Sequence, residues 1–269
     1  MYITLDNLVT QCGLQNSPTS EVITFLDKVC EDRLEPFIDN CYGQLSEYVN
    51  AFEQKMKMKR EAIANKGIWT AKKRYILNVW NNEGVQYTEP KLKMMGIEAV
   101  RSSTPAACRA NIKKAIGVII NQDEDAIIKF IENFRNEFKK MPFEDVAFPR
   151  GCKGLSDYSD LNTIYRKATP IHVRGALLYN WVLKKNKLDQ RYQMIQEGDK
   201  IKFCYMKLPN PINENVLACP STLPKQLGLD SYIDYDTQYD KSFVEPIKTI
   251  LDAIGWRVEK KASLDEFFS

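Results

Sequence analysis

The sequence predicts an α+β fold, and three patterns point to that class. Between residues 17 and 52, apolar side chains recur at steps of three and four, the spacing of a long amphipathic helix. Lys73–Trp80 and Val85–Glu89 are strand-like runs joined across a turn-rich tetrapeptide, which predicts a hairpin. Beyond Gly96 the apolar period becomes mostly helical.

The first elements are a short strand and the long helix. Met1–Leu5 has the pattern of a strand, and Ser17–Ser20 offer caps for the helix that follows. Pro36 predicts a kink or break within that helix. Its apolar stripe should lie along a sheet that contains the hairpin.

The later part of the chain predicts helices with few strands. Ser103 or Thr104 should cap a helix with Pro105 at its first position, running to about Asn121. The remaining expected elements are a helix from Asp123 to before Pro142, an irregular connection over 142–169 with some helix near Ser159–Arg166, a helix from Thr169 through Lys184, a strand over Lys200–Met206, a loop through Pro224, and a helix over Ser242–Ile254 ended by Gly255.

The most informative segment is the basic run that enters the first hairpin strand. Side chains alternate faces along a strand, so Lys73 and Tyr75 should share one face and Lys72 and Arg74 the other. Ammonium and phenol tips are long donors that could reach minor-groove acceptors, while the opposite face meets phosphate. The alternative is a solvated strand edge that discourages aggregation.

Neighbouring cations extend this run into a basic stripe. The net charge of the chain is only +3, so a local cationic track is a feature of this segment and not of the whole protein. Such a track is the electrostatic footprint of a nucleic-acid backbone site. Its other members are Lys55, Lys57, Lys59, Arg60, Lys66, Lys91, Lys93 and Arg101.

Six islands, in order, resemble one family. They are REAIA at 60–64, Lys66–Trp80, EPKLKMMG at 89–96, SSTP at 102–105, IHVRG at 171–175 and KKASLDEFF at 260–268. Together they resemble the family B replicative DNA polymerases of tailed phages. The resemblance implies the end of a palm of antiparallel strands and a long helix over 1–97, a mainly helical thumb over 98–259 and a clamp-binding tail over 260–269.

The resemblance also implies roles, partners and a location. Primer-template DNA would be sensed in the minor groove by Lys73 and Tyr75. The protein would act in the cytoplasm of a bacterial host, with a sliding clamp as a further partner. The residues expected to hold phosphates are Lys72, Arg74, Lys91, Lys93 and Arg174.

One family feature is missing from this sequence. The YGDTDS motif, whose aspartate binds the catalytic metals, would precede Met1, and the earlier palm aspartate motif is absent as well. The Mg²⁺ of the complete enzyme would therefore be bound by a separate N-terminal polymerase half, and no catalytic residue is expected here. The chain alone should not polymerise DNA. The alternative is a stand-alone DNA-binding or clamp-binding accessory protein.

A helix start at Ile171–Gly175 is a second candidate DNA contact. Backbone N–H groups and the positive end of a helix dipole favour an anion there. Arg174 can bind phosphate bidentately, and Gly175 can allow a close backbone approach. His172 is the other candidate, with a satisfied structural histidine as the alternative.

The last ten residues carry a third candidate site. Leu264, Phe267 and Phe268 are spaced i, i+3, i+4, so one helical turn would place them on one face. A groove on a sliding clamp would bury them. Docking back onto the chain's own body is the alternative.

Composition excludes several other classes. No apolar run is long enough to span a membrane, and the N-terminus is not a signal peptide. The seven cysteines have no C-x-x-C spacing and are expected to be buried free thiols, and one histidine makes zinc binding unexpected. Asp234, Asp236 and Asp240 lack the EF-hand pattern.

Overall fold

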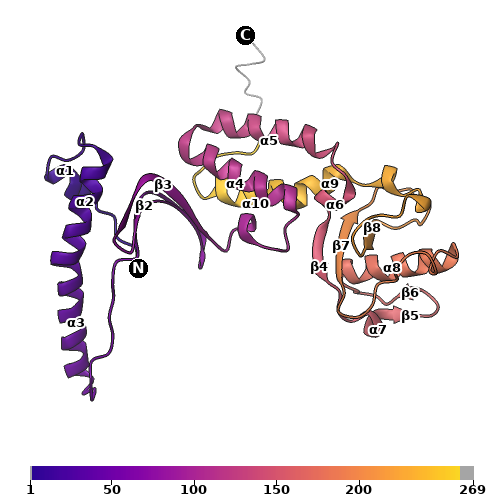
Figure 1. Ribbon diagram of the computed structural model, residues 1–269, viewed down its shortest axis with the longest axis horizontal. Helices are drawn as coiled ribbons and strands as arrows, with labels where there is room; N and C mark the ends of the chain where they lie inside the picture. Colours follow the sequence, from indigo (N-terminus) through magenta and orange to yellow (C-terminus); the bar gives the residue numbers. More distant parts are fainter. Residues whose placement is uncertain (1, 261–269) are drawn as a thin grey trace, which may run out of the picture. The chain divides into compact units, whose positions relative to one another are not determined.

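The computed structural model describes residues 2–260, and it confirms the α+β class with helices and small antiparallel sheets (Figure 1). The chain divides into two compact units. The first comprises Met1–Ile68 and Tyr75–Met95, and the second comprises Trp69–Arg74 and the chain from Gly96 onward. The domain bounds expected at 1–97 and 98–259 stay a prediction.

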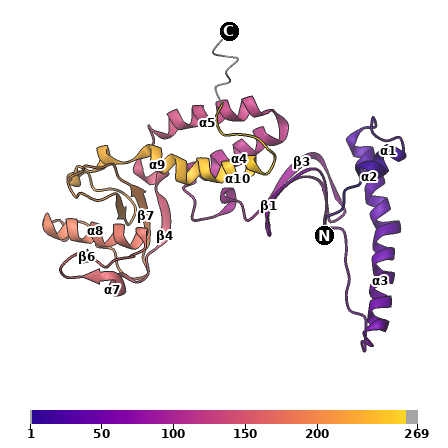
Figure 2. The same ribbon diagram turned by 180° about the vertical axis from the view of Figure 1, so that it is seen from behind.

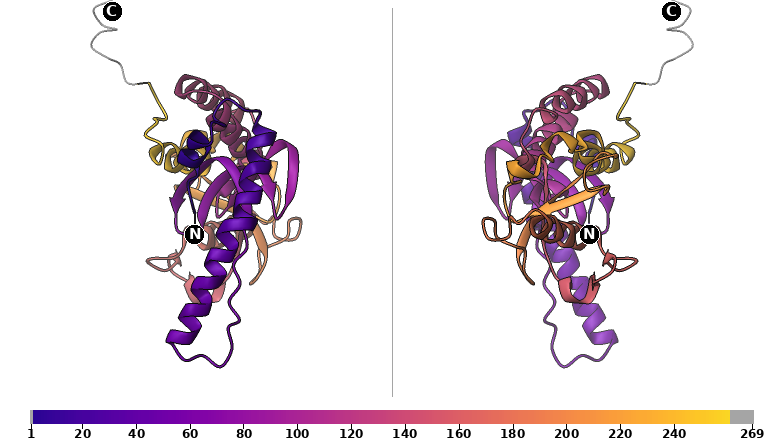
Figure 3. Two further views of the ribbon diagram at one scale, coloured as in Figure 1. Left: turned by 90° about the vertical axis from the view of Figure 1, so that its left-hand side faces the viewer. Right: turned by 90° about the vertical axis from the view of Figure 1, so that its right-hand side faces the viewer.

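The first unit contains a long helical rod and most of a three-stranded sheet. The rod is one continuous run of α2, a π-helical segment η1 and α3, as Figure 3 shows. Pro36 stands in the first turn of α3, so the expected break is a change of helix type. The elements are α1 (Asp6–Gln11), α2 (Thr19–Val29), η1 (Cys30–Leu34), α3 (Glu35–Tyr48), β1 (Ala62–Ala71), β2 (Arg74–Asn82) and β3 (Val85–Met95).

The sheet has the order β1-β2-β3, and β2 pairs antiparallel with β3. The hairpin over β2 and β3 is therefore confirmed, with longer strands than expected. Glu83 and Gly84 form its turn and both have positive φ, 51° and 87°. Strand β1 was not expected from the sequence. The residues at the turn between β1 and β2 group with the second unit.

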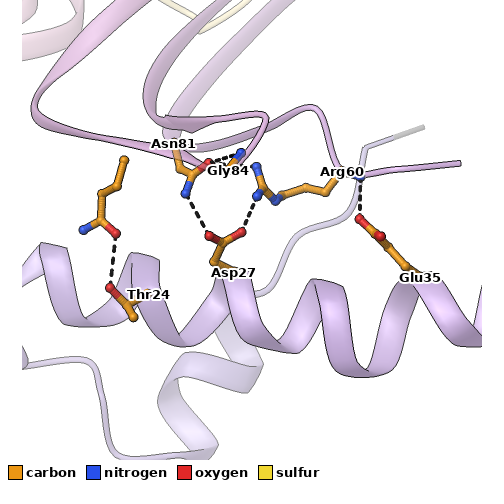
Figure 4. A network of polar contacts seen from close by, with 7 residues as sticks. Thr24, Asp27, Glu35, Arg60, Asn81 and Gly84 are labelled. Atoms are coloured by element: carbon orange, nitrogen blue, oxygen red, sulfur yellow. Dashed lines mark hydrogen bonds and ion pairs between the residues drawn. The ribbon is translucent and has the colours of Figure 1, made fainter.

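A buried polar network fastens α2 to the sheet. Asp27 on α2 accepts a hydrogen bond from Asn81 of β2 at 3.0 Å and forms an ion pair with Arg60 (Figure 4). Arg60 also donates to the Asn81 side chain at 2.9 Å, so the three side chains close a ring of contacts. Arg60 is therefore a structural residue of the basic stripe, because its charge is used inside the unit.

The expectation that the whole rod lies along the sheet is wrong for its second half. Ile23, Leu26 and Cys30 are buried, whereas α3 has no buried residue at all. Residues 2–5 form no strand, and none of the β-ladders among residues 2–260 includes them; Tyr2 and Ile3 are exposed. A strand needs a neighbour for its backbone groups, which explains this difference.

The second unit begins with two packed helices. The helices α4 and α5 match the expected positions, and Asp123 caps α5 by accepting from the Ala126 N–H at 2.9 Å. Neither Ser103 nor Thr104 caps α4, whose N-cap is Pro105. The elements to this point are η2 (Glu98–Val100), α4 (Ala106–Asn121), α5 (Glu124–Phe138) and α6 (Phe143–Val146).

An aromatic cluster forms the core of these helices with the end of the chain. Phe134 lies 4.7 Å from Phe243 and 5.6 Å from Tyr239, measured between ring centroids. The buried Tyr239 hydroxyl donates to the Ile131 carbonyl at 2.6 Å. The final helix begins earlier than expected, as α9 (Tyr235–Tyr239), a π-helical segment η5 (Asp240–Val244) and α10 (Glu245–Asp252).

A second sheet with the order β4-β7-β8 supports helix α8, which lies beside it in the view from behind (Figure 2). Strand β7 and helix α8 were expected, whereas β8 lies in the stretch expected to be a loop. The expected helix over 159–166 is wrong, because a small hairpin forms there. The elements are β4 (Phe148–Gly151), α7 (Leu155–Tyr158), β5 (Ser159–Asp160), β6 (Ile164–Tyr165), α8 (Ile171–Lys185), β7 (Lys200–Tyr205), β8 (Val216–Cys219), η3 (Lys225–Leu227) and η4 (Asp230–Tyr232).

All seven cysteines are free thiols, as expected, but not all are buried. Cys12 and Cys41 are exposed, and the other five are buried. Burial raises the pKa of the Cys152 thiol to about 11, which makes it a poor nucleophile near neutral pH. No helix among residues 2–260 is both long and apolar enough to cross a bilayer.

Candidate nucleic-acid interface

The candidate interface begins with an exposed pair of lysines at the turn between β1 and β2. Lys72 and Lys73 are both exposed there, and Lys73 has a positive φ of 62°. The expectation that Lys72 to Tyr75 alternate along one strand is therefore wrong. The chain reverses direction at the two lysines, and β2 begins only at Arg74. Strand alternation applies to Arg74 and Tyr75 alone.

Gly96 packs directly against this turn. A Cβ atom at this position would lie 2.5 Å from the Lys73 carbonyl oxygen and 2.9 Å from the Arg74 Cγ. Gly96 also has a φ of +67°, which other residues rarely adopt. The segment after β3 can approach the lysine turn this closely only because residue 96 is glycine.

Arg74 is held by an acid in the same segment. Its guanidinium donates to both carboxylate oxygens of Glu98, at 2.8 and 3.0 Å. Arg101 approaches the same carboxylate at 3.6 Å. The structure thus uses Arg74 in an internal ion pair, and its charge is shared between Glu98 and any external ligand.

The other candidate residues near the hairpin lie in the first unit. Tyr75 meets Tyr2 edge to face, with ring centroids 6.1 Å apart. Lys91 is exposed, with its ammonium 4.0 Å from the ring centroid of Tyr87. This ammonium therefore stays close to solvent.

Lys93 is engaged within the first unit. Its ammonium pairs with Glu61 at 2.5 Å and donates to Asn82 at 3.1 Å. The hydrogen bond with Glu61 raises the pKa of Lys93 above its ordinary value. Of the two lysines on β3, Lys91 is thus the one available to an external phosphate.

The candidate residues on α8 occupy its first turn. Arg174 donates to the side chain of Asn215 and lies over the ring of Tyr165, 5.7 Å from its centroid. Burial lowers the pKa of His172, and the nearby Arg150 lowers it further, so the ring is neutral near pH 7.

Gly175 is needed for packing on the sheet side of α8. A Cβ atom there would lie 3.0 Å from the Ala218 backbone nitrogen and 3.2 Å from the Ala218 Cβ. The close backbone approach expected at this glycine is therefore confirmed, and the approaching chain is β8 of the same unit.

Arg150 is the residue that the sequence did not reveal. It lies on β4 and lines a cavity together with Arg74, and it also lies near enough to His172 to affect its pKa. It follows a proline in a stretch expected to be irregular, and no spacing or motif marks it. The structure thus brings two separate candidate segments of the second unit toward one unexpected arginine.

The clamp-binding residues expected in the tail cannot be placed on this geometry. Leu264, Phe267 and Phe268 lie outside the described residues. Within residues 2–260, no group of three or more His, Cys, Asp or Glu side chains could hold a metal ion.

Comparison with known proteins identifies the class. The model of DNA polymerase family B matches residues 38–254, so the chain belongs to this family. It is similar to the DNA-directed DNA polymerase of Enterobacteria phage T4, with 32% identity, and to that of Escherichia phage RB69, with 34% identity. Each alignment covers 100% of this chain and 31% of the relative.

Proposed function

We propose that this chain is the C-terminal palm and thumb portion of a family B DNA polymerase, which grips the primer-template duplex during replication. The first unit would complete the palm and the second would form the thumb. The observation that carries the proposal is the exposed lysine pair, Lys72 and Lys73, presented on a hairpin turn by a chain of this family. Exposed cations fixed at a turn suit contact with a polyanion.

The structure refines the proposed division of roles. Lys72 and Lys91 would hold phosphates. Lys73 would reach into the minor groove, and Tyr75 would do so from the next strand. Arg174 would add a phosphate contact at the start of α8. The half-buried His172 would contact DNA only as a hydrogen-bonding partner while neutral.

The catalytic carboxylates and Mg²⁺ would come from a separate N-terminal part of the polymerase. Bound Mg²⁺ would neutralise charge that develops during phosphoryl transfer. The present chain would position the duplex and would be inactive alone. Each relative extends well beyond this chain, which spans 31% of its length.

The exposed face of α3 is the proposed docking surface for that N-terminal part. Phe37, Leu45 and Tyr48 are 65%, 44% and 87% exposed, and their spacing places them on one side of the helix. Large apolar side chains gathered on one exposed face mark an interaction surface. A polypeptide equivalent to the preceding part of the relatives would bury them.

Reconstitution tests the function. The purified chain should bind a primer-template duplex yet extend no primer with Mg²⁺, and addition of the N-terminal polypeptide should restore extension. Extension by the chain alone would refute the division of labour. Failure to bind duplex under any salt condition would refute the function itself.

A matched pair of variants tests the docking surface. Tyr48→Asp should abolish co-purification of the two polypeptides, because a charge would be buried in an apolar contact. Val85→Asp alters another exposed apolar residue of the same unit, on β3, and serves as the control. If both variants lose co-purification equally, or if neither loses it, α3 is not the contact surface.

A further inference from the structure

A polar cavity in the second unit has no role in the function proposed so far. Its volume is about 310 Å³, and it lies between the turn residue Arg74, the segment after Gly96, strand β4 and the last helix. Its charged lining residues are Arg74, Glu98, Arg101, Arg150, Lys241 and Glu245.

Positive charge exceeds negative charge in this lining, with four cations against two carboxylates. Glu98 is shared by two arginines, and Lys241 pairs with Glu245. Arg150 has no carboxylate partner among the described residues. Its guanidinium donates only to the carbonyl oxygens of Ser103 and Pro149, at 3.0 and 3.2 Å. The cavity therefore keeps a cationic surplus.

One donor at the cavity also lacks an acceptor. The Nε of Arg74 is buried and has no hydrogen-bond partner among the described residues. The hydroxyl groups of Ser103 and Thr104 belong to the lining. Helix α4, which begins just after them, has neither a side-chain cap nor an acidic residue in its first turn. An anion would satisfy this arrangement.

We propose that this cavity binds a phosphate group of a nucleic-acid backbone. Guanidinium groups match the oxygens of a phosphate with paired hydrogen bonds. A base is a poorer occupant, because the aromatic side chain of the lining, Phe148, already carries the Arg150 guanidinium, 6.0 Å from its ring centroid. The inference rests on the proposed function and adds Arg150 to two members of the basic stripe, Arg74 and Arg101, that line the same cavity.

Duplex binding measured over a salt series tests the assignment on the full chain. Fluorescence anisotropy with a labelled duplex should show that Arg150→Gln weakens binding several-fold and reduces the salt slope by about one. Arg101→Gln should act in the same direction. Because the Arg101 side chain is 47% exposed and makes one ion pair, at 3.6 Å, this second variant does not threaten the fold.

Lys129→Gln is the matched control, because it removes the same charge from an exposed position on α5 outside the cavity lining. It should leave the salt slope unchanged. Equal slopes for all three variants would overturn the cavity assignment while leaving the proposed function standing.

A measurement with pyrophosphate distinguishes the two possible sources of the phosphate group, which are a nucleic-acid backbone and a free phosphate compound. Pyrophosphate should raise the melting temperature of the chain very little at concentrations at which duplex DNA binds. Protection by pyrophosphate that Arg150→Gln abolishes, without any change in duplex binding, would overturn the backbone assignment in favour of a free-phosphate site. If the unmodified chain bound no duplex, the proposed function would fail and the backbone assignment with it. The pyrophosphate result would then show whether the cavity binds phosphate at all.

Discussion

Arg74 and Glu98 are joined by two hydrogen bonds in which one guanidinium nitrogen donates to both carboxylate oxygens. The pair links the first residue of β2 to the segment beyond β3. Both side chains are largely buried, with 25% and 18% exposed. One acid thus fixes the base of the lysine turn and also offsets positive charge in the neighbouring cavity.

Glu98→Gln should therefore have opposite effects on stability and DNA binding. Loss of the carboxylate leaves two arginines without their acid, which should lower the free energy of unfolding by about 1–2 kcal/mol. Removal of the negative charge should tighten duplex binding, because the cavity becomes more cationic. Chemical denaturation and anisotropy measure the two effects. Glu132→Gln, at an exposed position on α5, is the control and should change neither.

The lysine turn gives a prediction that separates charge from conformation. Lys73→Gly should weaken duplex binding and impair extension by the reconstituted enzyme, yet it should not destabilise the chain, because glycine accepts the positive φ. Lys72→Ala should weaken binding to all sequences alike and lower the salt slope by about one. If both variants bind duplex as well as the unmodified chain, the turn is not a DNA contact.

Gly96→Ala should destabilise the chain and displace the turn. The added methyl group would meet the Lys73 carbonyl oxygen and would sit on an unfavourable φ, at a combined cost of ~2 kcal/mol or more. Gly117→Ala is the matched control in α4, where nothing lies within 4 Å. It should raise stability by ~0.5–1 kcal/mol, since alanine is the better helix former. Thermal unfolding of both variants measures the contrast.

His172 predicts a dependence of stability on pH. Burial and Arg150 hold its pKa below the ordinary 6.5, so the unfolded state binds more protons in that range. The contribution of neutral His172 to the free energy of unfolding should be complete above about pH 6.5. It should be lost as the pH falls toward the lowered pKa of this residue. His172→Gln should remove that slope. Equal slopes in the two proteins would contradict the assignment.

The same histidine can report on DNA directly. It is the sole histidine of the chain, so its NMR titration is unambiguous. If a phosphate lies beside α8, addition of duplex should raise the pKa of His172, because the anion favours the charged ring. A midpoint that duplex leaves unchanged would place the DNA away from this helix start.

The terminal residues yield a prediction about the clamp. Deletion of residues 263–269 should leave folding and DNA binding nearly intact while abolishing clamp-stimulated processivity, since Leu264, Phe267 and Phe268 would be the main anchors, each contributing ~2 kcal/mol or more. Clamp pull-down and calorimetric melting of the truncated chain distinguish a clamp-binding tail from a tail that docks on the chain's own body. A destabilised chain that still binds its clamp would show that the tail packs on its own body.

The sequence predicted best those elements whose signals are local. The apolar stripe of α5 and the Asn81–Gly84 turn were both located, because helical periodicity and turn chemistry are encoded within a few residues. β1 and β8 were missed, since each is a strand mainly through the neighbour with which it pairs. The caps failed at α4 and α8, where proline itself takes the N-cap position.

The candidate site was predictable as a composition but not as a geometry. The cluster around Lys72 and Lys73 was visible, whereas the reversal of the chain between β1 and β2 was not. Whether an arginine is free or paired depends on distant acids: Glu98 for Arg74, and Asp27 for Arg60. Arg150 had no signal at all, because its partners are brought together only by tertiary structure.

The π-helical segment Cys30–Leu34 has a consequence for the direction of the rod's apolar stripe. From Ile23 to Tyr48 the apolar residues keep one phase of a 3.6-residue period, so an unbroken α-helix would point them all one way. A π turn is underwound by about one residue, which rotates everything after it by roughly a quarter of a turn. The apolar stripe therefore faces two directions. The apolar side chains of α2 face the sheet, whereas those of α3 point about a quarter of a turn away from that direction. Winding η1 as a regular α-helix, with no residue removed, would bring both halves back into phase.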